Sequence, residues 1–111
     1  MFVAKLTSDG NLEWFKMFTG SGSEQLIRLL KQDDGGVLAM GNTDSYGEGS
    51  FDAVLLKLSA SGEVLVSRLY GSSNYELTYD IAKVQSGGYA LSGVSVGYGA
   101  GLGDFLLYTL Q

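Results

Sequence analysis

The chain has 111 residues, a net charge of −5 and neither cysteine nor histidine. A composition that is 45% hydrophobic and 17% charged is typical of one folded domain. The lack of Cys and His excludes disulfides, thiolate nucleophiles and the commonest zinc ligands. The acidic balance argues against a nucleic-acid partner, and no apolar run approaches the roughly 18 residues of a membrane span.

The sequence repeats itself with a period of 52 residues. In an ungapped alignment of the chain with itself, 15 of 59 overlapping positions are identical, where about five are expected by chance, so the repeat is real. Matched positions include Lys5, Leu6, Gly35, Gly36 and Asp52, which fall on Lys57, Leu58, Gly87, Gly88 and Asp104. The chain therefore divides into repeat 1 (residues 1–52), repeat 2 (residues 53–104) and the first strand of a third repeat (residues 105–111).

Repeat 1 predicts four strands, because β-branched, aromatic and aliphatic runs alternate with clusters of turn residues. We expect these strands at Phe2–Leu6, Leu12–Phe18, Leu26–Gln32 and Val37–Thr43. The first turn contains Asp9-Gly10-Asn11, which accepts the positive φ angles of a tight hairpin. The run from Leu26 could instead start a helix, but the nearby Gly pair favours a strand. The strand at Leu12–Phe18 is apolar on both sides, so we expect both of its faces to be at least partly covered, as in a sheet packed between neighbouring sheets.

Repeat 2 predicts the same pattern. After the Gly-rich connection at residues 44–52 we expect strands at Ala53–Leu58, Val64–Tyr70, Leu77–Gln85 and Tyr89–Val96, and a ninth at Phe105–Leu110. Four strands in about 50 residues are typical of β-propeller blades. The predicted fold is all-β, with β-propeller-type four-stranded antiparallel repeats, two units plus one extra strand.

The residues also resemble a known family. Lys-Leu-x-x-x-Gly-x-Leu-x-Trp stands at Lys5 to Trp14, and Asp34-Gly35-Gly36 precedes a strand that ends in Gly. Over essentially the whole chain this resembles the bacterial and archaeal β-propeller repeats of secreted and cell-surface proteins. The resemblance implies that the strands before Gly35 and Gly87 line a central channel and that the strands at 12–18 and 64–70 lie at outer edges. Repeat 2 departs from the motif, with Val66 in place of Trp14.

That resemblance is the basis for expecting an extracellular or cell-surface location, since no secretory leader is recognisable after Met1. Two units are fewer than the four or more blades of a closed propeller, and alone they leave apolar faces and strand edges in water. Three arrangements remain open: part of a longer propeller, a ring of several copies, or an open array. We favour self-assembly, because the repeat starts and stops at the same strand.

Aromatic residues are the candidate ligand-binding groups. Tyr46 and Tyr98 recur in the Gly-rich loops, and Trp14 adds a further ring. Aromatic rings beside polar groups can bind sugars, and repeated weak sites gain from multivalency. The alternative, which we favour, is that these rings pack between blades.

Carboxylates in the Gly-rich loops are weak candidates for calcium binding, namely Asp44, Glu48 and Asp52. We favour a role in turns, because repeat 2 replaces two of them, with Val96 and Ala100. Glu24 and Glu76 recur at equivalent positions and, with Asp52 and Asp104, could supply the paired carboxylates of a glycosidase. An active site is normally built once, so recurrence argues for a structural role. We expect no catalytic residue, metal or cofactor.

The sequence as a whole favours a non-enzymatic β-propeller repeat protein that acts as a scaffold or protein-interaction module. A lectin-like carbohydrate-binding module is the first alternative, and a fragment of a propeller enzyme the second. The expected partners are copies of the chain itself or additional blades, with glycans in the first alternative. Neither nucleic acid nor membrane insertion is expected.

Overall fold

The computed structural model describes residues 1–85, 87–97 and 104–110, and the side chains of residues 1–85 and 87–97. This part of the chain contains nine strands and no helix: β1 (Phe2–Leu6), β2 (Leu12–Met17), β3 (Glu24–Lys31), β4 (Val37–Thr43), β5 (Asp52–Leu58), β6 (Val64–Tyr70), β7 (Glu76–Lys83), β8 (Tyr89–Ser95) and β9 (Asp104–Leu110). The predicted all-β class is confirmed, and predicted strand ends agree to within two residues. The helical alternative after Leu26 is wrong, because that segment lies in β3. No helix in the described residues is long and apolar enough to cross a membrane.

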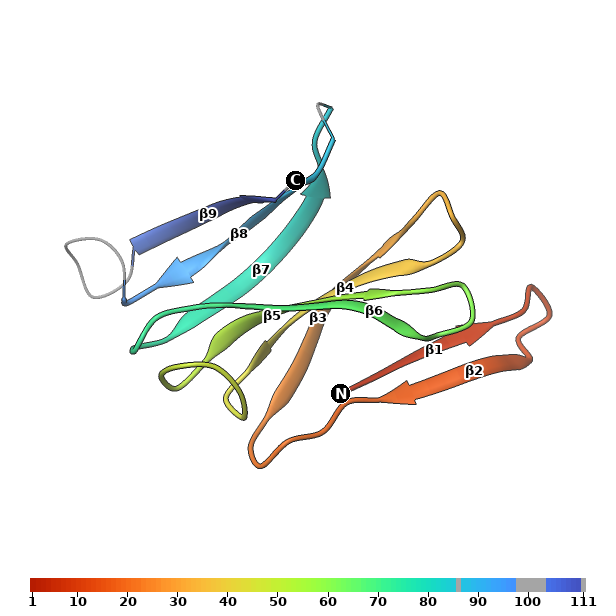
Figure 1. Ribbon diagram of the computed structural model, residues 1–111, viewed down its shortest axis with the longest axis horizontal. Coiled ribbons are helices and arrows are strands. Elements are labelled where there is room, and N and C mark those ends of the chain that lie inside the picture. Colours follow the sequence, from red (N-terminus) through yellow and green to blue (C-terminus); the bar gives the residue numbers. More distant parts are fainter. Residues whose placement is uncertain (86, 98–103, 111) are drawn as a thin grey trace.

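The strands form three antiparallel sheets in chain order (Figure 1): β1-β2, then β3-β4-β5-β6, then β7-β8-β9. The sheets do not coincide with the sequence repeats. The four-stranded sheet takes β3 and β4 from repeat 1 and β5 and β6 from repeat 2, and the two halves are joined by pairs from Val37↔Leu58 to Thr43↔Asp52. The sheet boundaries are thus shifted by two strands from the repeat boundaries.

Equivalent irregularities recur in the two repeats. The hairpin turn after β1 has Gly10 at φ 85°, as predicted. β3 has a bulge at Leu26–Arg28, and β7 has one at Thr78–Asp80. Gly41 and Gly93 pair with these bulged strands, and a Cβ on either would lie 2.1 Å from a carbonyl oxygen of the neighbouring strand. Only glycine allows that close approach.

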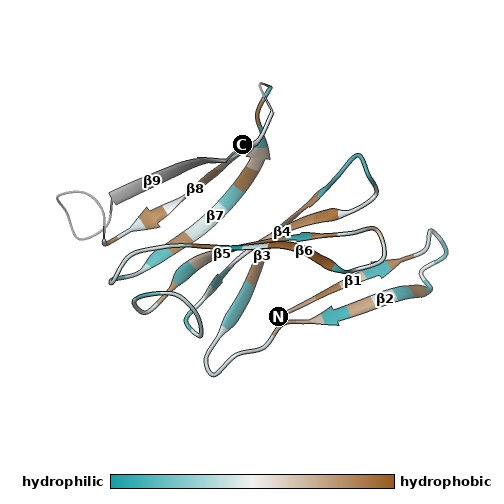
Figure 2. Cartoon of the chain, viewed as in Figure 1, coloured by the Kyte–Doolittle hydropathy of each residue, from teal (hydrophilic) through white to brown (hydrophobic). Residues whose placement is uncertain are grey.

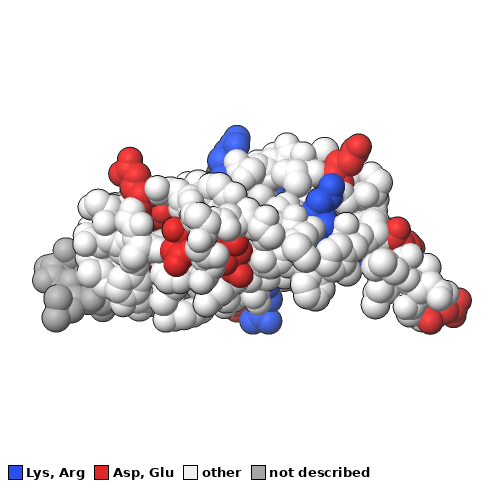
Figure 3. All heavy atoms as spheres, turned by 90° about the horizontal axis from the view of Figure 1, so that it is seen from below, with Lys and Arg blue, Asp and Glu red and all other residues white. Residues whose placement is uncertain are grey.

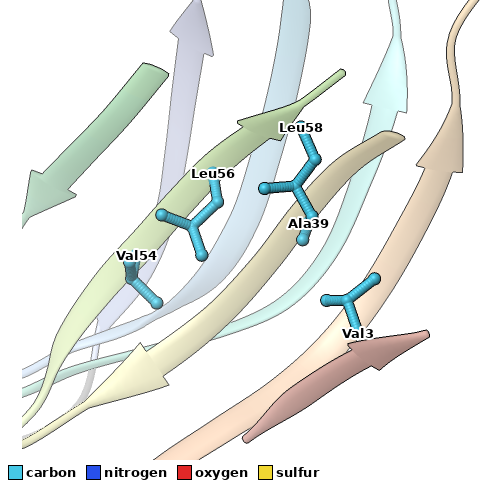
Figure 4. Packing of buried hydrophobic residues seen from close by; sticks show 5 residues of the cluster. All are labelled: Val3, Ala39, Val54, Leu56 and Leu58. Carbon is cyan, nitrogen blue, oxygen red and sulfur yellow. The ribbon is translucent and has the colours of Figure 1, made fainter. Parts of the chain in front are cut away.

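Two apolar clusters hold the three sheets together, and both faces of β5 contribute. The first lies between β1-β2 and β3–β6 and consists of Val3, Ala39, Val54, Leu56 and Leu58 (Figure 4). The second lies between β3–β6 and β7–β9 and consists of Leu38, Met40, Leu55, Ile81 and Leu91. Full burial of such a side chain stabilises the fold by about 1.5–3 kcal/mol. The two central strands of the middle sheet, β4 and β5, are therefore covered on both faces.

Polar contacts also join the middle sheet, β3–β6, to the third sheet, β7–β9. The side chain of Asn42 in β4 accepts hydrogen bonds from the Thr78 backbone N–H at 2.8 Å and the Thr78 hydroxyl at 2.9 Å. Arg28 of β3 pairs with its repeat equivalent in β7, Asp80, at 3.0 Å. The first strands of two successive sheets, β3 and β7, therefore lie next to each other.

Candidate functional site

Trp14 lies between the first two sheets. Its indole packs against the first apolar cluster, and Nε1 donates a hydrogen bond to the Ala60 carbonyl at 2.9 Å, in the turn between β5 and β6. A single side chain of β2 thus binds the first sheet to the second. The Trp14 ring therefore packs between two sheets in this position.

Replacing Trp14 by phenylalanine removes this hydrogen bond and keeps an aromatic ring. We expect the free energy of unfolding to fall by about 1 kcal/mol, the usual contribution of one such bond plus lost contact area. Urea denaturation followed by circular dichroism measures it. The matched variant Tyr46→Phe removes a hydrogen bond at a more exposed site, so its free energy of unfolding should fall by less. A larger fall in Tyr46→Phe than in Trp14→Phe would contradict the role of Trp14 in joining the first two sheets.

Tyr46, unlike Trp14, is largely open to solvent, because it is 54% exposed. Its hydroxyl donates to the Thr19 carbonyl at 2.7 Å. The ring lines a cavity of about 420 Å³ between the first two sheets, together with Phe18, Glu24 and Leu56. Trp14 does not line this cavity, so the structure does not bring the two predicted rings into one site. Tyr98 lies outside the described residues.

The predicted calcium candidates are separated. Asp44 accepts a short hydrogen bond from the Ser23 backbone N–H and so ties two loops together. Glu48 and Asp52 instead line a small cavity of about 180 Å³. Nowhere in the described residues do three or more acidic side chains gather in a way that could hold a metal ion.

Asp52 is the most unusual of these groups. It is 2% exposed, and its Oδ1 has no hydrogen-bond partner among the described residues. Burial raises the pKa of Asp52 above its usual value, and the nearby Glu76 and Glu48 carboxylates raise it further, while a hydrogen bond from the Glu48 backbone opposes this rise. Asp52 therefore keeps its proton more readily in the folded chain than in the unfolded one.

The raised pKa predicts a pH dependence of stability. As pH rises above the unfolded value of 3.8, the unfolded state loses the Asp52 proton first, so the stability contributed by this group falls until the folded-state pKa is passed. As pH rises above 3.8, the urea midpoint of wild type should therefore fall relative to that of Asp52→Asn, and Asp9→Asn in an exposed turn serves as the control. Parallel profiles for wild type and Asp52→Asn would contradict this.

Glu24 and Glu76, the recurring pair, stand at the starts of β3 and β7 and fasten loops. Glu76 is 0% exposed, and its carboxylate accepts bonds from the Ser72 N–H and hydroxyl, both at 2.7 Å, and from the Ser95 hydroxyl at 2.8 Å. Glu24 accepts a short bond from the Ser45 hydroxyl. The Glu76 contacts hold the loop before β7 against the end of β8, and the Glu24 contact binds β3 to the loop after β4.

The sequence analysis missed an exposed apolar face on the first sheet. We call this the outer face, and it consists of Phe2, Leu6, Phe15 and Met17, which are 57%, 57%, 49% and 60% exposed. Phe2 and Phe15 stack with ring centroids 5.3 Å apart, and Figure 2 shows hydrophobic residues along both strands. We expected both faces of the strand at 12–18 to be at least partly covered by neighbouring sheets, but no other sheet of the described residues packs over Phe15 and Met17.

The repeat shows what such a face looks like when it is covered. Val54 and Leu58, the repeat-2 equivalents of Phe2 and Leu6, are 8% and 0% exposed, because the first sheet packs over them. On β3, Leu29 is 44% exposed, whereas its equivalent Ile81 on β7 is 3% exposed. Phe2 and Leu6 therefore occupy positions that are buried in repeat 2, where the first sheet packs over them. Leu69, the equivalent of Met17, is 43% exposed and shows that this cover does not extend over β6.

Charged groups do not gather into a basic patch on the side of the molecule that Figure 3 presents, where Lys and Arg are separated among acidic side chains. No protein-family model matches the sequence. A search of curated proteins finds no significant match either.

Proposed function

We propose that the chain is a non-enzymatic β-propeller-type scaffold or protein-interaction module, whose sheets pack against those of further copies or of additional blades. Three features support this: the successive antiparallel sheets, the contact between the first strands of neighbouring sheets, and the resemblance to propeller repeats. The extracellular or cell-surface location is proposed on that resemblance alone.

The exposed outer face carries the proposal. Its residues are apolar, and the repeat equivalents of Phe2 and Leu6 form part of the first cluster. A face of this kind marks an interaction surface, and a preceding sheet is the structure that covers the equivalent positions within this chain. Covering each large side chain would contribute about 1.5–3 kcal/mol, which is enough for several together to drive association.

The carboxylates support a non-enzymatic role. Glu76 is buried and its oxygens accept three hydrogen bonds. Asp52 is nearly inaccessible and lines only a small cavity. A glycosidase needs an acid and a base that reach a sugar, which these two groups do not.

Light scattering of the purified chain at several concentrations tests self-assembly. We expect a discrete oligomer. Phe15→Asp should raise the protein concentration at which the oligomer forms at least tenfold, because a charge would be buried at the contact. Ser61→Asp, which adds the same charge in an exposed turn, should have no effect. A wild-type chain that stays monomeric would contradict self-assembly.

A carbohydrate-binding module is the second candidate, favoured by the cavity beside Tyr46. An exposed tyrosine ring next to a carboxylate, as Tyr46 is next to Glu24 in this cavity, can match an apolar sugar face and a hydroxyl. Calorimetric titration with simple sugars and a glycan array tests it. Binding that is lost in Tyr46→Ala would support this candidate, and no binding to any glycan would rule it out.

A further inference from the structure

β1 has an unpaired edge that its repeat equivalents do not have. β5, the equivalent of β1, is bound along this edge by β4. Within the described part of the chain, β1 pairs with β2 alone. One repeat after β4 comes β8, which β9 binds along the corresponding edge. β1 and β9 are both equivalents of β5, so they are alternative partners for the same edge of β8.

We propose that copies of this chain exchange this strand: the β1-β2 hairpin of one copy displaces β9 from β8 of the next copy and completes a four-stranded sheet, β7-β8-β1-β2. This inference rests on the proposed self-assembly and names its contact. The partner is a second copy of the chain, because β5 is bound along this edge by β4. The repeat equivalent of β4 is β8 of the same chain.

The register of the exchanged pair follows from two existing pairs. Lys57 lies opposite Leu38 in the four-stranded sheet, and these residues are the equivalents of Lys5 and Ala90. In the third sheet Ala90 lies opposite Thr109 of β9, which is the residue that corresponds to Lys5 two repeats earlier. Both pairs place Lys5 of the incoming hairpin opposite Ala90.

The exchange would also cover the part of the outer face that β1 supplies. In the four-stranded sheet the equivalents Val54 and Leu58 face the preceding sheet. In the exchanged sheet Phe2 and Leu6 of the outer face would therefore face β3–β6 of the receiving copy, where Val66 on β6 is 36% exposed. β9 supplies one strand to β8, whereas the hairpin supplies two. β1 has five residues and β9 has seven, so the exchange gives up some backbone pairing, and the added apolar burial favours the hairpin.

Engineered cysteines test the register in the full chain, which has no cysteine of its own. Paired antiparallel residues have Cα atoms about 4.5–5.5 Å apart, within the range of about 4.4–6.8 Å for a disulfide. Lys5→Cys with Ala90→Cys should form reducible covalent multimers after mild oxidation, several-fold more than the two single variants. Lys5→Cys with Leu91→Cys, one residue out of register and on the opposite face, should cross-link no more than the single variants.

A second variant fixes β9 to β8 covalently and so prevents strand exchange. Ala90→Cys with Thr109→Cys joins β9 to β8 within one chain, so the oxidised protein should stay monomeric and regain the wild-type oligomer after reduction. If wild type assembles but the oxidised lock assembles equally well and Lys5→Cys with Ala90→Cys does not cross-link, strand exchange is wrong and self-assembly stands. A monomeric wild type would overturn both. Circular dichroism of each variant checks that it is folded.

Discussion

Replacing Leu58 by alanine is expected to lower the free energy of unfolding by about 2–5 kcal/mol. Leu58 is 0% exposed and packs in the first apolar cluster with Val3 and Leu56. Removing three carbon atoms there leaves a cavity between two sheets, which can relax only in part. Urea denaturation at a dilution where the chain is monomeric measures the loss.

The repeat supplies the control, Leu6→Ala. Leu6 is the equivalent of Leu58 but is 57% exposed, so in the monomer its truncation should cost only about 0.5 kcal/mol. The same chemical change thus tests burial alone. Equal losses in the two variants would show that the first sheet does not cover Leu58 as described.

Loss of the Glu76 carboxylate is expected to cost about 3–4 kcal/mol, although the residue belongs to neither apolar cluster. Glu76→Ala leaves the Ser72 N–H, the Ser72 hydroxyl and the Ser95 hydroxyl without their acceptor. Each buried unsatisfied group costs about 1–3 kcal/mol, and some of these donors turn to solvent once the side chain is gone. Urea denaturation measures the loss, and faster proteolysis of the loop at residues 71–75 should accompany it.

Glu24→Ala is the matched control for this prediction. Glu24 is only partly buried, and its carboxylate accepts from the Ser45 and Thr43 hydroxyls. We expect a loss of about 1 kcal/mol. A Glu24 variant that is destabilised as much as the Glu76 variant would mean that full burial of the Glu76 carboxylate and its bond to Ser95 add nothing beyond a partly buried contact.

The strands could be predicted from the sequence because their signals are local. Asp9-Gly10 and the glycine pair at 35–36 mark turns, and the apolar runs between them have the length of strands. How the strands group into sheets could not be predicted in the same way. A period of 52 residues does not say where a unit begins, and only the pairing of Val37 with Leu58 shows that the sheet spans the repeat boundary.

The candidate site was predictable in part for a similar reason. Recurrence pointed to Glu24 and Glu76 as structural groups, and the structure gives them equivalent contacts with the hydroxyls of Thr43 and Ser95. The outer face was missed because apolar residues on both sides of the strand at 12–18 indicate that both faces need to be covered. They do not indicate whether this chain supplies the cover. Comparing Phe2 with the equivalent Val54, once burial is known, reveals the difference.

The offset between repeats and sheets bears on how such a chain can change length. Each 52-residue repeat supplies the last two strands of one sheet and the first two of the next. Duplication of one whole period, with its breakpoint at any residue, would therefore add one complete four-stranded sheet and leave the neighbouring pairings as they are. Lengthening in other steps would leave strands without partners, so this architecture is expected to grow in whole periods.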